Sequence, residues 1–121
     1  MSDVLRQISS IGTSIWLDDL SRERLVSGGS ARPLREVIEK DSVVGVTTNP
    51  AIFSSAISNS PLYRDDIRAL HKDGADIESI ITSLTSSDVS AACELFADVH
   101  QRSGGIDGRV SIEVDPRLAR N

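Results

Sequence analysis

Apolar and polar positions follow a period of two in some stretches of the chain and a period of three to four in others. Three stretches predict β-strands: residues 13–18 (TSIWLD), 42–48 (SVVGVTT) and 109–115 (RVSIEVD). The first is dominated by β-branched and aromatic residues, and the third alternates aliphatic with polar positions. The second is an almost continuous apolar run, which is typical of a parallel strand buried on both faces.

Helical patterns occupy the intervals before the second strand. We expect a short helix over residues 3–10 and a helical turn that begins after Ser21. A further helix, capped by Ser30, would end near Asp41. Its apolar face would comprise Leu34, Val37 and Ile38.

Longer helical patterns follow the second strand. Asn49-Pro50 and Ser60-Pro61 each place a capping residue before a proline, which is the usual start of a helix. Asp76 and Ser87 are expected to cap two further helices before the third strand. Alternation of strands with helices predicts an α/β fold, with a parallel sheet and crossover helices.

The last residues begin a pattern without completing it. Asp115-Pro116 is a helix-start signal, yet the sequence ends at Asn121, too soon for a helix to be sustained because nucleation is unfavourable. We therefore expect residues 1–121 to be a portion of one longer domain.

Composition excludes several function classes. The formal net charge is −5 and no run of Lys or Arg occurs, which argues against a nucleic-acid partner and against an anionic membrane surface. The single cysteine, Cys93, cannot form an internal disulfide, and the N-terminal residues lack the apolar core of a secretory signal. We expect a cytoplasmic protein.

Polar side chains stand at the C-terminal end of each predicted strand: Asp18, then Thr47 to Asn49, then Glu113. Strand alternation puts Glu113 on the face opposite the three aliphatic positions of its strand, so it would point away from the helices. In a parallel α/β barrel, functional sites lie at this end of the sheet. Carboxylates and an amide converging there could transfer protons and bind a polyhydroxyl substrate.

Each of these residues also has a purely structural interpretation. Asn49 is a good helix N-cap, and Asp18 and Asp19 could cap the following turn. Thr47 and Thr48 could be ordinary β-branched strand residues, and Glu113 could face water at a sheet edge. We interpret Cys93 as a small core residue. His71 and His100 lie near predicted helix C-termini without a metal-ligand neighbour at useful spacing, so we assign no metal.

Three motifs resemble a known family when they are taken together and in order. The segments SIWLDDLSRERL, GVTTNPAIFSSAI and VSIEVDPRLA are similar to three successive segments of the transaldolases, most closely the longer bacterial type. The resemblance covers nearly the whole chain. It implies the N-terminal part of a (β/α)₈ TIM barrel, with about three strands and their crossover helices, so that residues 1–121 are a portion of a single barrel domain.

The resemblance also implies a reaction. Transaldolases act on sugar phosphates in the non-oxidative pentose phosphate pathway. They transfer a dihydroxyacetone unit from sedoheptulose 7-phosphate to glyceraldehyde 3-phosphate through a lysine Schiff base, without a cofactor. By this resemblance, Asp18 takes a hydroxyl proton during carbon–carbon cleavage and Glu113 acts through a catalytic water. Asn49 binds hydroxyls of the dihydroxyacetone part, and Thr47 lines the same pocket.

One element of the family pattern is missing. The Schiff-base lysine of the family lies on the strand after the VSIEVD segment, whereas this sequence has only Lys40 and Lys72, in predicted C-terminal helical turns. We expect the chain to be inactive alone. Two alternatives are a non-catalytic part-barrel that pairs with a separately encoded remainder, and a related sugar-phosphate aldolase.

Overall fold

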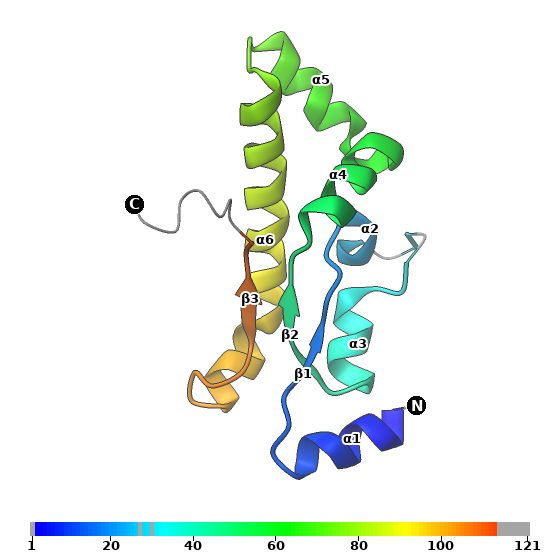
Figure 1. Cartoon of the computed structure of the whole chain (residues 1–121), viewed down its shortest axis with the longest axis vertical. Coiled ribbons are helices and arrows are strands. Elements are labelled where there is room, and N and C mark those ends of the chain that lie inside the picture. Colours follow the sequence, from blue (N-terminus) through cyan, green and yellow to red (C-terminus); the bar gives the residue numbers. More distant parts are fainter. Residues whose placement is uncertain (1, 27, 30, 114–121) are drawn as a thin grey trace.

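The computed structural model describes residues 2–26, 28–29 and 31–113, which form a small parallel sheet and a set of helices that pack against it or extend beyond its ends (Figure 1). The elements, in chain order, are α1 (Ser2–Ser10), β1 (Ile15–Leu17), α2 (Arg22–Leu25), α3 (Leu34–Lys40), β2 (Val43–Thr47), α4 (Pro50–Asn59), the 3₁₀ helix η1 (Pro61–Tyr63), α5 (Arg64–Lys72), α6 (Ile77–Arg102) and β3 (Arg109–Ser111). The predicted alternation of strands and helices is confirmed. The expected end of the last strand and the Asp115-Pro116 helix start lie outside the described residues.

The sheet is parallel throughout, in the order β1-β2-β3. β2 pairs with β3 in simple register, from Gly45 opposite Arg109 to Thr47 opposite Ser111. β1 pairs with the other side of β2, with one irregularity after Ile15. Each predicted strand therefore exists, and the strand predicted to be buried on both faces is the central one.

The hydrophobic core lies between the sheet and the helices α3 and α6. Val46, at the centre of β2, is fully buried in it together with Leu34 and Phe96. Figure 1 shows α6 running along the sheet and continuing well beyond its end, toward α4 and α5. There a second cluster forms around Tyr63, with Ile80 and Leu84 of α6. Within the described residues, no helix is long and apolar enough to cross a bilayer.

The structure differs from the sequence-based prediction at two expected helix starts. α6 is one helix of 26 residues, so the predicted break at Ser87 is wrong. Apolar side chains continue on the same face through this position, and their packing outweighs the local capping tendency of serine. α3 starts at Leu34 after Pro33, not after Ser30, because the Pro33 carbonyl accepts the first helical N–H bonds.

The prediction that Cys93 belongs to the core is also wrong, since its side chain is exposed. The buried stripe of this part of α6 comprises Val89, Ala92 and Phe96. Cys93 is one residue beyond Ala92, which rotates it by about 100° out of that stripe.

Gly45, in the middle of β2, leaves room for the indole ring of Trp16. A Cβ at Gly45 would lie 2.4 Å from Cε2 of Trp16, well inside van der Waals contact. We therefore expect Gly45→Ala to lower the free energy of unfolding by about 1–3 kcal/mol, as overpacking does in other proteins. Urea unfolding followed by circular dichroism measures this change.

The matched control is the same substitution in a Trp16→Leu background. Because the clash is with the indole, most of the loss of stability should disappear there. An equal loss in both backgrounds would contradict this account of Gly45.

Candidate active site

The carboxyl ends of the three strands meet at one edge of the sheet. Asp18 directly follows β1, Thr47 is the last residue of β2, and Glu113 lies two residues after β3. Because Leu17 pairs with Val46 and Thr47 with Ser111, the strand ends are level with one another. Parallel α/β folds place their functional residues at this edge.

Asp18 and Thr47 are joined by a short hydrogen bond. Thr47 Oγ1 donates to Asp18 Oδ1 at 2.5 Å. Asp18 is exposed and Thr47 is half-buried, so the carboxylate is anchored at one oxygen and accessible to solvent. A hydroxyl that donates to an ionised carboxylate makes one of the stronger hydrogen bonds in proteins. The bond therefore orients the Asp18 side chain on the β2 strand end.

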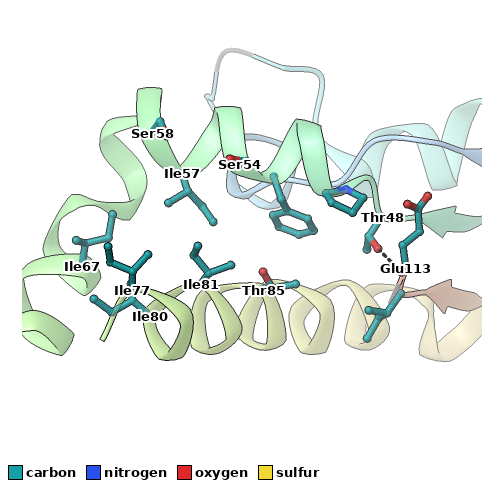
Figure 2. A pocket seen from close by; sticks show the side chains of 13 residues that line it. Thr48, Ser54, Ile57, Ser58, Ile67, Ile77, Ile80, Ile81, Thr85 and Glu113 are labelled. Carbon is teal, nitrogen blue, oxygen red and sulfur yellow. Dashed lines mark hydrogen bonds between the residues drawn. The ribbon is translucent and has the colours of Figure 1, made fainter. Parts of the chain in front are cut away.

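Glu113 is fixed through its backbone by Thr48. The Glu113 N–H donates to Thr48 Oγ1 at 3.2 Å, and the Thr48 N–H donates to the Ser111 carbonyl at 3.0 Å. Thr48 is buried, whereas Glu113 is exposed. Figure 2 shows the Glu113 carboxylate pointing away from α6, so the expected orientation away from the helix layer is observed.

Thr48 lies within the predicted polar stretch at the end of β2, but its role in holding Glu113 was not predicted. Its two bonds extend the pairing of β2 and β3 past the last strand residues. The sequence evidence for this role was weak, because a threonine at the end of an apolar strand is common. Only the register of β3 shows that its hydroxyl holds Glu113.

Asn49 is a helix N-cap, which confirms the structural interpretation given above. Its Oδ1 accepts the N–H groups of Ala51 and Ile52, at 3.0 and 3.4 Å. The capping bonds use only the side-chain oxygen. Within the described residues the Nδ2 group forms no hydrogen bond, so it can still donate to a ligand at this edge.

Asp18 does not cap the following turn. Ser21 is the residue before α2, and it forms no side-chain capping bond. Asp18 instead accepts from Thr47, and the neighbouring Asp19 is paired with Arg24 at 2.8 Å. Two acidic neighbours in the sequence thus have different partners.

A buried polar network holds the start of α2, four residues after Asp18. The Tyr63 hydroxyl donates to Asp88 Oδ2 at 2.5 Å and accepts the backbone N–H of Arg22 at 2.7 Å. Arg22 Nε donates to Asp88 Oδ1 at 3.0 Å, and its guanidinium carbon lies 4.4 Å from the centre of the Tyr63 ring. Asp66 accepts a further bond from Arg22 at 2.6 Å. The network ties α2 to η1, α5 and α6.

The network was not predicted, because its members come from distant parts of the sequence. Tyr63 and Asp88 are both almost fully buried. Burial, together with the hydrogen bond to Asp88, raises the pKa of the Tyr63 phenol well above its usual value. The phenol therefore stays neutral and acts as a donor to the Asp88 carboxylate.

Histidines and acidic residues do not gather into a metal site in the part of the chain that the structure describes. His71 and His100 lie in the last turns of α5 and α6, where a cation complements the helix dipole.

A parallel sheet, crossover helices on one face and polar side chains at the carboxyl edge are features of α/β enzyme domains such as the (β/α)₈ barrels. The family model for transaldolase/fructose-6-phosphate aldolase matches residues 15–121. The chain belongs to this family.

Curated relatives agree with that assignment. The chain is 51% identical over 113 residues to a transaldolase of Renibacterium salmoninarum. The aligned residues are 93% of this chain and 29% of the relative. It is 46% identical over 119 residues to a transaldolase of Frankia alni, and the aligned residues are 98% of this chain and 31% of the relative. For a transaldolase of Mycolicibacterium smegmatis the identity is 50% over 117 residues, which are 97% of this chain and 30% of the relative. The chain spans about 30% of the length of these relatives, corresponding to their N-terminal part.

The single tyrosine makes the buried network directly measurable. A phenol whose folded-state pKa is raised stabilises the fold below the unfolded-state pKa, about 10, and this contribution is lost as the pH rises through the folded-state value. We expect almost no tyrosinate absorbance at 295 nm at pH 11 while the chain is folded, and about 90% ionisation at that pH in urea.

Because Tyr63 is the only tyrosine, the signal has one source. In an Asp88→Asn variant the amide lacks the negative charge that opposes ionisation, so Tyr63 should ionise at lower pH. Half-ionisation near pH 10 in the folded wild-type chain would show that the phenol is not buried against Asp88.

Proposed function

We propose that the chain is the N-terminal portion of a transaldolase domain and contributes the proton-transferring and hydroxyl-binding residues of the active site. The proposed reaction moves a dihydroxyacetone unit from sedoheptulose 7-phosphate to glyceraldehyde 3-phosphate. The single observation that carries the proposal is the arrangement of Asp18, Asn49 and Glu113 at one edge of a parallel sheet, in a chain that belongs to this family.

Asp18 is the proposed base for carbon–carbon cleavage. It is an exposed carboxylate whose orientation is set by Thr47. A base that removes a hydroxyl proton must lie within hydrogen-bond reach of that hydroxyl and keep its direction during the reaction. The bond from Thr47 supports the second requirement, and the exposure of Asp18 supports access for substrate.

Thr47 and Asn49 are the proposed contacts for substrate hydroxyls. The Thr47 hydroxyl donates its hydrogen bond to Asp18, so the lone pairs of its oxygen can accept from a substrate hydroxyl. Asn49 offers the complementary group, because its Nδ2 donates while its Oδ1 is held by α4. An acceptor and a donor at the same strand end suit a polyhydroxyl ligand.

Glu113 is the proposed partner of the catalytic water. Its carboxylate is exposed and points away from the helix layer, while its backbone is held by Thr48. A water bound by this carboxylate could exchange protons with the carbinolamine formed and broken along the Schiff-base route.

The nucleophile is proposed to come from outside residues 1–121. Lys40 is the last residue of α3, three residues before β2 begins at Val43, and its side chain is 64% exposed beside Glu36. Lys72 is exposed in the last turn of α5. A Schiff-base lysine needs a desolvated site, whereas both of these side chains are exposed at helix ends.

Two alternatives to this proposal are left for experiment to decide. The remainder of the domain could be a separate polypeptide, and the family name also covers fructose-6-phosphate aldolases. The three relatives described above are all named transaldolase, which favours transfer to an acceptor sugar over simple cleavage. The cytoplasmic location stays a prediction.

The test of this proposal uses a chimera in which residues 1–121 replace the matching part of the Mycolicibacterium smegmatis transaldolase. We expect the chimera to convert sedoheptulose 7-phosphate and glyceraldehyde 3-phosphate into erythrose 4-phosphate and fructose 6-phosphate. Asp18→Asn should lower its kcat by about 100-fold or more, the usual contribution of a positioned base. Steady-state kinetics with a coupled assay measure the effect.

Asp107→Asn is the matched control. Asp107 also accepts a bond from a hydroxyl, that of Ser14 at 2.7 Å, but it precedes β3 and so lies at the opposite edge of the sheet. Its kcat should stay within about twofold of the unsubstituted chimera. Undiminished turnover by Asp18→Asn, or an equal loss in both variants, would rule out the proposed role of Asp18.

A further inference from the structure

An apolar groove opens between α4 and the first half of α6, beyond the carboxyl end of the sheet (Figure 2). Its volume is about 430 Å³. The aliphatic lining comes from four parts of the chain, and consists of Ile57, Ile67, Ile77, Ile80, Ile81 and Ile112. Three of these isoleucines are strongly exposed: Ile77 at 77%, Ile112 at 52% and Ile81 at 45%.

The groove is continuous with the open edge of the sheet. Among the described strands β3 pairs only with β2, so the backbone groups on its far side have no strand partner. Ile112 and Glu113, which directly follow β3, line the groove. The unpaired edge and the apolar groove therefore form a single surface, which we call the β3–α6 surface.

Both parts of this surface have a known tendency to associate. A contiguous set of exposed isoleucines marks an interaction site more often than a solvated face. An unpaired strand edge accepts a further strand. A partner that adds a strand beside β3 and a helix against α6 would bury both at once, as parallel βα units do.

The relatives indicate what this partner is. They match the chain over about 30% of their own length, at their N-terminal part, so most of a transaldolase chain follows the position of β3. We infer that the β3–α6 surface binds the C-terminal remainder of a transaldolase domain, and that it does so even when the two parts are separate polypeptides. The identity of the partner rests on the proposed function.

A second copy of this chain fits less well. Each copy carries a net charge of −5, so self-association brings like charges together. Every pairing already in the sheet is parallel, and a following βα unit of the same domain continues that pattern. Self-association is thus an outcome that the test must separate from the inferred one.

The test co-expresses the tagged 121-residue chain with the untagged C-terminal remainder of the Mycolicibacterium smegmatis transaldolase. Affinity purification followed by light scattering should give a one-to-one complex. Hydrogen exchange should show new protection at Arg109–Ser111 and at residues 77–85, compared with the chain alone. The exchange measurement needs no substitution, so it is informative even if a variant misfolds.

The variants Ile77→Glu and Ile81→Glu should each reduce the recovered complex at least tenfold. Ile106→Glu is the matched control, because Ile106 has the same exposed fraction, 77%, and does not line the groove. It should leave recovery unchanged. Far-ultraviolet circular dichroism of the purified chains checks that each variant keeps its helices.

The outcomes separate this inference from the proposed function. A complex that forms through the surface but transfers no dihydroxyacetone upholds the inference and counts against the function. An active chimera with no complex between the separate parts contradicts the inference alone. A homodimer of the chain that Ile77→Glu dissociates, or a complex insensitive to both groove variants, also contradicts it.

Discussion

Parallel pairing of β2 with β1 on one side and β3 on the other is the constraint on which the rest of this structure depends. Parallel neighbours cannot be joined by a tight turn, so the chain must cross back over the sheet between strands. The crossovers, α2–α3 and α4–α6, bury one face of the sheet around Val46. Because all strands point the same way, the residues that follow them gather at one edge. That edge carries Asp18, Asn49 and Glu113.

Local chemistry predicted most of this architecture. The apolar run around Val46 indicated the central strand, and Asn49-Pro50 and Ser60-Pro61 marked helix starts that the structure confirms. Where the local capping signals predicted the wrong helix boundary, tertiary packing determined the structure. Ser87 offers a cap, yet α6 passes through it because Leu84 and Val89 on either side are buried in the same helix. A capping preference of about 1 kcal/mol cannot interrupt a helix that is held by tertiary contacts along its length.

The candidate site was predictable as a set of residues but not as a set of contacts. Strand alternation and the parallel arrangement indicated which polar residues share the carboxyl edge. The hydrogen bond from Thr47 to Asp18, and the one from Glu113 to Thr48, depend on strand register, which periodicity does not specify. The Tyr63–Asp88–Arg22 network was beyond sequence reasoning for a similar reason. Its members are 25 to 66 residues apart and meet only after α6 has packed against α2 and η1.

The central claim is that this chain holds the acid–base and hydroxyl-binding side of a transaldolase site, while the nucleophile lies elsewhere. Borohydride reduction in the presence of fructose 6-phosphate tests it most directly, because it converts a Schiff base into a stable amine that mass spectrometry can locate. The account predicts no adduct on the isolated 121-residue chain, and in the chimera an adduct on a lysine outside residues 1–121. A specific adduct on Lys40 or Lys72 would contradict it.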